Sequence, residues 1–510
     1  MSADPPPGTA TPAIVLAGGA ADATAHFPPT ADARPTLDDA LTNRLADTGA
    51  AVDTTPATRA EHSRDWWPQA MIWATDGEVP ALGAAVVTPH DADEVAAVLR
   101  ICNEARVPVT ASGGRSGVCG SAVPVCGGVI LDTTAMSGIV DVDATSMILD
   151  VLPGTFGDAL EDVLRSDHAV TVGHWPQSMT LATVGGWLAC RGAGQYSTRY
   201  GKIEDIVVGL DVVLADGTLI HTGGQPRQAV GPDLNQLFVG SEGTLGVITG
   251  ARLRLHPAAA TERRAAYAFD DFGVALDACR RAVQRGATPA VLRLHDTTEA
   301  VRFGLEGRHL VIVLDEGDPT IVDAAMAVVD DECRRDGERL DDGDTIVAAW
   351  IEHRNDVAAL EALITKGYVV DTMEVAGPWS RLEAIHTAAT EAIGSIDGTL
   401  VVSCHQSHAY TDGACLYFTF AAQVDAGSRN AYYVAAWDAG TRAVLGAGGA
   451  LSHHHGVGIN RARFVRDALG GGLDVFASIK AALDPNGILN PGKLGLPSAF
   501  GEPAWPGASR

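Results

Sequence analysis

The residues best suited to chemistry form one uninterrupted run, Ser452-His453-His454-His455-Gly456-Val457-Gly458. Histidine has the side chain whose ordinary pKa lies closest to neutrality, so a cluster of imidazoles can transfer protons or hold an anion. The glycines that follow allow a sharp turn or a close approach to a ligand. The run is internal and flanked by apolar residues, which disfavours an affinity tag, a metal-scavenging tract or a solvated loop. We therefore predict a functional role for His453, His454 and His455.

Three glycine-rich segments, 112–120, 183–194 and 240–246, form a second group, and each is expected to follow a strand. Without Cβ atoms, backbone N–H groups can converge on a diphosphate. Hydroxyl groups that could add donors belong to Ser116, Ser178, Thr183 and Ser241. The alternative is that the glycines only build tight turns, but their recurrence favours a dinucleotide cofactor. The segment 113–117 does not match the GxGxxG pattern of a Rossmann site.

The elements that must position these segments follow from hydrophobic periodicity and turn signals. In the N-terminal half we expect strands at 84–87, 107–111, 129–132 and 147–151 and helices at 91–104, capped by Asp91 or Asp93, and at 156–165. The segments 206–214 and 218–221 are expected to form a hairpin. Farther along we expect helices at 272–285, 320–336 and 474–482 and strands at 310–314, 401–404 and 414–420. No internal repeat is visible.

Composition excludes several classes of function. A chain of 510 residues should form two or three domains. Its net charge of −27 disfavours nucleic-acid binding and docking on anionic lipid. The eight scattered cysteines contain no CxxC pair, which indicates reduced thiols in a cytoplasmic protein. We expect no transmembrane span and no signal peptide.

Four stretches, 109–121, 173–178, 183–187 and 240–248, together resemble the FAD-binding domain of the vanillyl-alcohol oxidase (PCMH-type) superfamily. The Asn490-Pro491-Gly492-Lys493 stretch resembles the C-terminal signature of that superfamily. The resemblance implies an α+β fold, with a two-subdomain PCMH-type FAD-binding domain and an α+β cap domain built on an antiparallel sheet. The expected parts are a largely mobile N-terminal tail (1–60, with a helix near 35–48), the FAD-binding domain (61–257), the cap or substrate domain (258–450) and a C-terminal segment that returns to the FAD domain (451–510).

The resemblance also implies bound FAD, held without a covalent bond, although His174 or Cys119 could attach it covalently. The residues that it places at the cofactor are Ser112, Gly113, Gly114, Arg115, Ser116, Gly117, Val118, Pro176, Gln177, Ser178, Met179, Thr180, Ala182, Thr183, Gly185, Gly186, Ala189, Cys190, Arg191, Gly192, Ser241, Glu242, Gly243, Thr244, Gly246, Val247, Asn490 and Lys493.

Within the superfamily the chain is most similar to the alkylglycerone-phosphate synthases. The segments that carry this likeness are 203–205, 292–294, 412–418 and the histidine run 452–458. It implies that Tyr417 is an acid/base whose pKa a cationic neighbour lowers, that His453–His455 surround it, and that Arg293 lies near the flavin. The implied reaction exchanges an acyl for an alkyl group through a flavin N5 adduct. The synthases bind phosphate through an arginine, and its place here falls at Leu360 or Glu361.

Two alternatives stay open. The first is an FAD-dependent dehydrogenase or oxidase of a D-2-hydroxy acid or alcohol. Relatives of that kind carry EHGxG and HxGDGNxH motifs. In this chain His454 replaces the glutamate of the first motif and Tyr417 replaces the last histidine of the second. The second is a non-catalytic flavin-binding protein. We expect a small or lipid-like substrate, a homodimer and no metal, although His405 and His408 form an HxxH pair that His454 and His455 could complete.

Overall fold

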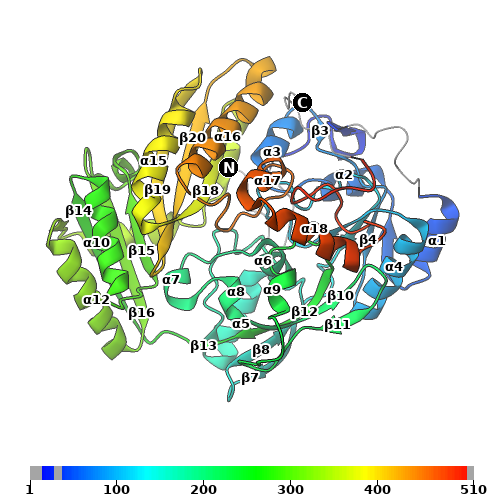
Figure 1. The fold of residues 1–510 in the computed structure, drawn as a ribbon, viewed down its shortest axis with the longest axis horizontal. Helices are drawn as coiled ribbons and strands as arrows, with labels where there is room; N and C mark the ends of the chain where they lie inside the picture. The colour runs from blue at the N-terminus through cyan, green and yellow to red at the C-terminus, as the bar shows by residue number, and fades with distance from the viewer. Residues whose placement is uncertain (1–13, 28–36, 502–510) are drawn as a thin grey trace.

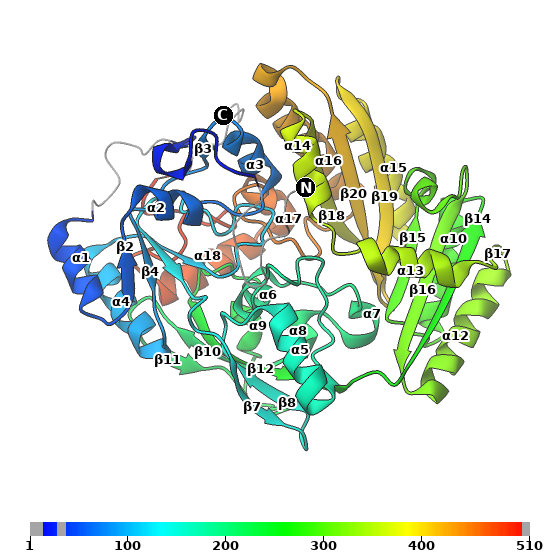
Figure 2. The same cartoon turned by 180° about the vertical axis from the view of Figure 1, so that it is seen from behind.

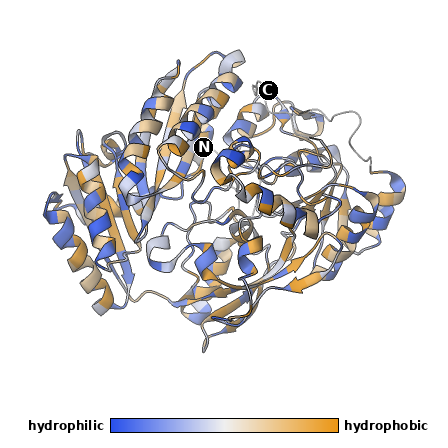
Figure 3. Cartoon of the chain, in the orientation of Figure 1, coloured by the Kyte–Doolittle hydropathy of each residue, from blue (hydrophilic) through white to orange (hydrophobic). Residues whose placement is uncertain are grey.

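The computed structural model describes residues 14–27 and 37–501. In Figure 1 the N-terminal half, blue to green, and the C-terminal end, red, lie together on one side, and the segment between them, green to orange, forms a separate layer beside them. Each side is built on its own sheet or sheets, and the hydropathy colouring of Figure 3 shows apolar strands beneath helices with one apolar and one polar face. No helix in these described ranges combines the length and apolar character needed to cross a membrane.

The first sheet is mostly parallel and belongs to the N-terminal half. Its strand order is β2 (Ala51–Asp53), β4 (Ala85–Thr88), β6 (Val129–Asp132) and β5 (Val109–Ser112). Only β2 pairs antiparallel, at the edge. Helix α4 (Ala92–Ala105) connects β4 to β5; it starts where the Asp91 carboxylate accepts the N–H of Glu94 at 2.9 Å. Its apolar residues at helical spacing, such as Val95 and Leu99, are buried, as the periodicity predicts.

The second sheet is antiparallel and lies beneath the first in the same half. Its order is β11 (Leu219–His221), β10 (Val207–Val213), β12 (Val247–Arg254), β8 (Ile148–Val151) and β7 (Ile139–Asp143). The helices of this part are α5 (Gly157–His168), α6 (Val184–Cys190), α7 (Ser197–Tyr200), α8 (Ile203–Ile206) and α9 (Asn235–Phe238). The predicted hairpin is confirmed, since β10 and β11 pair antiparallel.

The third sheet, called here the cap sheet, is antiparallel throughout. Its order is β17 (Glu338–Arg339), β14 (Thr261–Phe269), β16 (His309–Gly317), β15 (Val291–His295), β19 (Thr399–Ala409), β20 (Gly413–Ala422) and β18 (Val369–Pro378). Helices α10 (Phe272–Gln284), α12 (Pro319–Arg334) and α15 (Trp379–Gly394) cover the face seen in Figure 1, whereas α13 (Gly343–His353) and α14 (Ala358–Thr365) lie in front in the reverse view of Figure 2. In β20, Leu416 and Phe418 join the apolar core while Tyr417 between them points to the other face.

The remaining elements are short or lie at the ends of the chain. They are η1 (Ala20–Asp22), β1 (Thr24–Ala25), α1 (Asp39–Ala46), α2 (Pro56–His62), α3 (Pro68–Ala74), β3 (Glu78–Val79), β9 (Val170–Thr171), β13 (His256–Pro257), α11 (Thr297–Ala300), η2 (Val301–Phe303), η3 (Ala426–Ser428), α16 (Arg429–Gly446), η4 (Ala462–Phe464), α17 (Val465–Leu469) and α18 (Gly472–Leu483). After α16 the chain returns to the first half, where Leu489 pairs with Val109.

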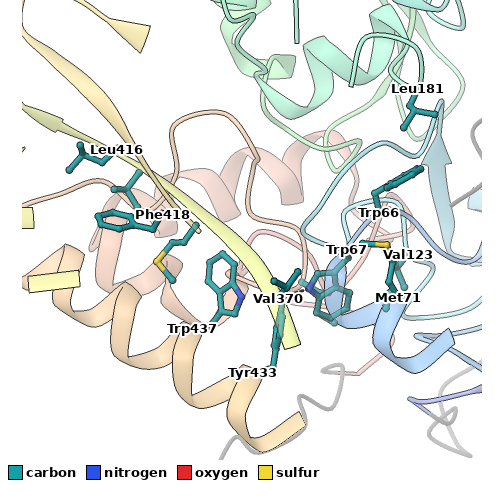
Figure 4. Close-up of a cluster of buried hydrophobic side chains, with 14 of the residues drawn as sticks. Trp66, Trp67, Met71, Val123, Leu181, Val370, Leu416, Phe418, Tyr433 and Trp437 are labelled. Atoms are coloured by element: carbon teal, nitrogen blue, oxygen red, sulfur yellow. Dashed lines mark hydrogen bonds between the residues drawn. The ribbon is translucent and has the colours of Figure 1, made fainter. Parts of the chain in front are cut away.

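A buried aromatic cluster joins the cap to the first half (Figure 4). The Trp67 indole N–H donates to the Tyr433 hydroxyl at 2.8 Å, and Tyr433 in turn donates to the Asp371 carboxylate. The Trp437 indole N–H donates to the same carboxylate oxygen at 2.9 Å. Burial raises the pKa of Asp371 to about 7 despite these donors. Contacts between α3, α16 and β18 therefore fix the cap against the first half.

The expected α+β fold, with a cap on an antiparallel sheet, is confirmed, while the four-part division of the chain stays a prediction. One expectation is wrong: residues 37–60 of the supposed mobile tail form α1, β2 and most of α2. Leu41 and Leu45 bury one face of α1, so this segment does gain a core. The helix expected near 35–48 is confirmed as α1; residues 1–13 and 28–36 lie outside the described residues.

The glycine-rich segments are placed partly as expected. The segment 112–120 follows strand β5, as predicted. The segment 183–194 instead contains α6, and 240–246 follows the short helix α9 rather than a strand. Sequence periodicity gave no sign of α9, because a helix of four residues is shorter than two turns.

Candidate active site

A row of polar residues crosses four neighbouring strands of the cap sheet. In register, His295 on β15 pairs with His405 on β19, His405 with Tyr417 on β20, and Tyr417 with Glu374 on β18. Residues directly opposite in an antiparallel pair lie on the same face of the sheet. The rings of His405 and Tyr417 stack with centroids 4.8 Å apart and an interplanar angle of 13°. The sheet thus gathers four chemically active side chains on the face away from α10, α12 and α15.

The Glu374 carboxylate holds the histidine run in place. It accepts the backbone N–H of His453, of His454 at 3.1 Å and of His455 at 2.9 Å. Arg461 completes the set with an ion pair to Glu374 of 3.0 Å in which both side chains are fully buried. Burial alone would raise the pKa of Glu374, but Arg461, His455 and the backbone donors hold it below its usual value. We call Glu374, Arg461 and His453–His455 the loop cluster.

A second buried glutamate holds the other end of the same loop. The Glu242 carboxylate accepts the N–H of Val457 at 2.7 Å and of Gly458 at 2.9 Å. Gly456 between the two anchors has a φ of 77°, and a Cβ there would collide with the Glu242 carboxylate, so only glycine fits. Burial raises the pKa of Glu242. The loop 452–458 is therefore clamped between a carboxylate of the cap and a carboxylate of the first half.

The three imidazoles are neutral near neutral pH. Desolvation lowers the pKa of His453 and His454 well below the usual value, and neighbouring histidines add to the effect. Desolvation also lowers the pKa of His455 to about 4, against the opposing pull of Glu374. The His454 and His455 rings stay 3.8 Å from Glu374, beyond hydrogen-bond distance, so no hydrogen bond to the carboxylate stabilises their protonated forms. A neutral cluster suits proton transfer better than anion binding.

Tyr417 lies against this cluster. Its hydroxyl donates to the Thr372 hydroxyl at 3.0 Å, and its ring centroid is 6.2 Å from that of His454 and 5.4 Å from that of His455. Arg293 does lower the pKa of Tyr417, but burial raises it by more, so the expected net lowering of that pKa is wrong. At rest Tyr417 is a neutral phenol that can donate a proton.

Arg293 belongs to a second group, which we call the strand cluster: Arg293, His295, Glu299 and His405. Arg293 donates to Nε2 of His405, whose Nδ1–H donates to the Glu299 carboxylate at 3.0 Å. His295 donates to the same carboxylate at 2.8 Å. Burial and the nearby Arg293 lower the pKa of His405 to about 3, which agrees with a neutral ring that accepts from Arg293. Glu299 balances the Arg293 charge through His405.

Neither histidine group offers a free set of metal ligands. Two groups have ligand atoms close enough to hold an ion, Glu374-Cys415-His453-His454 and His295-Glu299-His405. The Glu374 carboxylate already accepts backbone and arginine donors, and both ring nitrogens of His405 already have partners, Arg293 at Nε2 and Glu299 at Nδ1. His408 of the HxxH pair is hydrogen-bonded through Nδ1 to Ser197 at 2.7 Å. The donor chemistry does not fit a metal, and its absence remains a prediction.

The loops 112–118 and 176–183 meet in a way that suits a diphosphate. A Cβ on Gly113 would collide with the Thr183 hydroxyl, and one on Gly114 with the carbonyl of Leu181, so the two backbones touch only because these positions are glycine. In the part of the chain that the structure describes, the N–H groups of 113–118 and 177–180 donate to no other protein group. The Ser112 hydroxyl and Nε of Arg115 are likewise buried without partners there. These open donors fit the phosphates of FAD.

Other residues expected at the cofactor have additional structural partners. Asn490 donates from Nδ2 to the carbonyls of Glu242 at 2.6 Å and Ser121 at 3.0 Å. The Lys493 ammonium donates to the Val123 carbonyl, and burial lowers its pKa to about 8. Arg191 turns to Glu204 on the surface. Their contact with FAD, like that of the other expected residues, stays a prediction.

Several residues of the site were not identified from sequence. Glu374 and Arg461 support the histidine run, Glu299 supports His405, and Ser197 and Tyr410 extend the hydrogen-bonded network. A usable signal existed for Glu374, since an acidic residue between Met373 and Val375 in a strand must find partners when it is buried. Ser197 carried no such signal.

Known families match most of the chain. Residues 83–223 match the family described as FAD binding domain, and residues 259–494 match the family described as FAD linked oxidases, C-terminal domain. An uncharacterized FAD-linked oxidoreductase, YgcU of Escherichia coli strain K12, is 30% identical over 437 residues, covering 81% of this chain and 88% of the relative.

The names of further relatives state different activities. An alkyldihydroxyacetonephosphate synthase of Dictyostelium discoideum is 29% identical, and the match covers 83% of this chain and 75% of the synthase. The glycolate oxidase subunit GlcD of Bacillus subtilis strain 168 is 28% identical, and the match covers 80% of this chain and 88% of the subunit. A solved alkyldihydroxyacetonephosphate synthase superposes with a TM-score of 0.74 at 24% identity, over 92% of this chain and 87% of that one, which shows a shared fold.

Proposed function

Because the chain belongs to the FAD-linked oxidase family of PCMH-type flavoenzymes, whose cofactor is FAD, we propose that it exchanges an acyl for an alkyl group in the manner of an alkylglycerone-phosphate synthase. The substrate would lie between the flavin and the face formed by Tyr417, His454 and His455. When bound, FAD supplies a centre that accepts a hydride or, once reduced, attacks carbon.

The observation that carries this proposal is a neutral phenol beside neutral imidazoles. In the exchange, the bond between the substrate carbon and the acyloxy oxygen breaks, a bond between that carbon and the oxygen of the incoming alcohol forms, and one proton passes from that alcohol to the departing carboxylate. The reaction therefore needs a proton donor and a proton acceptor in one pocket. Tyr417 is a neutral donor and the neutral His454 is an acceptor whose ring centroid lies 6.2 Å away.

A second candidate is oxidation of a D-2-hydroxy acid or an alcohol. It is favoured by Arg293, whose buried Nε has no partner among the described residues and could bind a substrate carboxylate. It is also favoured by α14, where Leu360 packs against the apolar core and Glu361 is acidic, so neither can bind a phosphate. In this reaction the carbon loses a hydride and a neutral imidazole accepts the hydroxyl proton.

One anaerobic experiment separates the two reactions. The purified yellow protein is mixed either with D-lactate, D-2-hydroxyglutarate or glycolate, or with palmitoyl-dihydroxyacetone phosphate and radiolabelled hexadecanol. The exchange reaction predicts a labelled ether product and no bleaching by the hydroxy acids. Bleaching of the flavin band by a hydroxy acid, without labelled ether, would instead establish oxidation.

Once that experiment has identified a substrate, variants test the role assigned to Tyr417. Tyr417→Phe should lower kcat by roughly 100- to 10,000-fold, the usual value of a positioned acid or base. Tyr432→Phe is a matched control, because it removes from α16 a hydroxyl that bonds to Thr399 at the start of β19, away from the site. Failure of every substrate, with flavin retained, would favour a non-catalytic flavin-binding protein.

A further inference from the structure

A continuous chain of hydrogen bonds leads away from the histidine run. Nδ1 of His454 is 2.9 Å from Nδ1 of His453, and Nε2 of His453 is 3.1 Å from the Tyr410 hydroxyl. Tyr410 is 3.0 Å from the Ser197 hydroxyl, which is 2.7 Å from Nδ1 of His408. The chain joins the C-terminal loop, the end of β19 and the first half of the molecule. We call these five residues the relay.

Each member of the relay is neutral and can both donate and accept. Desolvation lowers the pKa of His408, His453 and His454 well below the usual value, and it raises the pKa of Tyr410. A neutral imidazole has one N–H and one lone pair, and a hydroxyl has both functions on one oxygen. The relay therefore has two complete arrangements, with every hydrogen bond pointing one way or every one pointing the other.

The relay reaches a cavity at the surface. Tyr410 and His453 form part of the wall of a cavity of about 480 Å³ that lies beside the end of β18. Most of its other lining residues are glycine, alanine or proline, and Asp412 is the acidic one among them. A wall of small residues leaves room for water beside the Tyr410 hydroxyl. The cavity gives the histidine run a connection to solvent through Tyr410 and His453.

We propose that Tyr410 and His453 conduct protons between the candidate active site and water in this cavity. A proton taken up at Nε2 of His454 moves the Nδ1–H proton of that ring to His453, the Nε2–H proton of His453 to Tyr410, and the Tyr410 proton to water. One proton enters, one leaves, and no bond between heavy atoms changes. The proposal rests on the proposed site, but it holds for exchange and for oxidation, because both move a substrate proton.

Charged groups around the relay favour the neutral state of its members. Lys202 donates from Nζ to the carbonyl of His453 at 2.7 Å, and its charge opposes protonation of the relay histidines. Glu204, Asp205 and Cys415 oppose ionisation of Tyr410. Arg293 adds to the positive field around His408. With cations near the imidazoles and acids near the phenol, protons cross the relay without a lasting charge on it.

The test uses the holoenzyme without substrate. FAD in the protein is reduced anaerobically with dithionite and then mixed with oxygen-saturated buffer, a reaction that returns the flavin to its oxidised form and takes up a solvent proton. Tyr410→Phe should slow this return on the order of tenfold, and 50 mM imidazole, which can enter the cavity, should restore part of the rate. Ala450→Trp, which fills the cavity mouth and leaves Tyr410 in place, should slow it as well.

Tyr432→Phe serves as the matched control and should leave the rate unchanged. A second readout needs no reaction: in protein labelled with ¹⁵N-histidine, the Nε2 resonance of His453 should shift in Tyr410→Phe and not in Tyr432→Phe. Equal reoxidation rates and equal solvent isotope effects in wild type and Tyr410→Phe would overturn the proposal. Because no substrate is used, that result differs from a failure of the proposed function, in which no substrate turns over.

Discussion

In the loop cluster the Glu374 carboxylate accepts backbone N–H groups, whereas in the strand cluster the Glu299 carboxylate accepts from the imidazole rings of His295 and His405. Both carboxylates are buried beside an arginine and several histidines. Glu374 contacts its arginine directly at 3.0 Å, while Glu299 reaches Arg293 only through His405.

The difference shows that a carboxylate near histidine can have two unrelated effects. Glu299 fixes the tautomer and orientation of two rings, as the carboxylate of an acid–base dyad does. Glu374 fixes the main chain and leaves the rings without a carboxylate partner, so their nitrogens remain available to one another, to Tyr410 and to a substrate. The loop cluster is accordingly the better candidate for proton transfer and the strand cluster for charge balance.

The largest effect is expected for Glu374→Ala. This change removes the acceptor of three backbone N–H groups and leaves the fully buried Arg461 without its counter-charge, so we expect a loss of about 3–5 kcal/mol in the free energy of unfolding. Urea denaturation measures it. The matched control is Glu391→Ala on the exposed side of α15, which should stay within about 0.5 kcal/mol of wild type. Equal losses of unfolding free energy in the two variants would show that Glu374 does not anchor the loop.

A double-mutant cycle tests charge balance in the strand cluster. Glu299→Gln should cost about 1–3 kcal/mol, because two imidazole N–H groups lose an anionic acceptor and Arg293 loses the charge that balances it through His405. Adding Arg293→Met should recover part of the loss, with a coupling free energy of about 0.5–3 kcal/mol, since the double variant contains no unbalanced charge. Additive losses in the cycle would show that Glu299 does not balance Arg293.

Because the imidazoles of the histidine run are neutral in the folded protein, the free energy of unfolding depends on pH. His455 has a folded pKa of about 4, whereas an unfolded histidine titrates near 6.5. The unfolded chain therefore binds a proton that the folded chain does not in the window between these values. The contribution of the neutral ring is complete above pH 6.5 and is lost as the pH falls toward 4.

His455→Asn should remove this dependence. Between pH 7 and pH 5 the variant should lose about 2 kcal/mol less unfolding free energy than wild type, as measured by urea denaturation at each pH. His353→Asn, on the exposed end of α13, is the matched control and should follow the wild-type curve. Parallel curves for wild type and His455→Asn would mean that His455 is protonated in the folded protein.

The smallest effect is expected at Lys202, which contacts the loop cluster from outside. Its ammonium donates to the His453 carbonyl at 2.7 Å and pairs with Glu204 at 3.1 Å. Lys202→Gln keeps a donor and should cost no more than about 1 kcal/mol, read from the thermal midpoint. A loss comparable to that of Glu374→Ala would mean that Lys202, rather than Glu374, holds the loop.

The sequence predicted the elements with clear periodicity and the residues with distinctive chemistry. Helix α4 with its Asp91 cap, the β10–β11 hairpin, the histidine run and Tyr417 could all be identified. The residues that hold the site in place, Glu374 and Glu242, could not be identified, because their roles depend on pairing between distant parts of the chain. Glu374 lies opposite Tyr417 only through the register of β18 and β20, and Glu242 meets Val457 only through the return of the C-terminal segment. Burial, which raises rather than lowers the pKa of Tyr417, was equally invisible.

The clamped loop also constrains the order in which the protein can mature on the ribosome. Glu242 and Glu374 are synthesised well before the N–H groups of 453–458 that satisfy them. Until that segment emerges, the nascent chain holds two carboxylates whose native burial would be costly, so both sites must remain hydrated. The arrival of segment 453–458 therefore excludes water from the interface between the cap and the first half, and the site becomes complete only then.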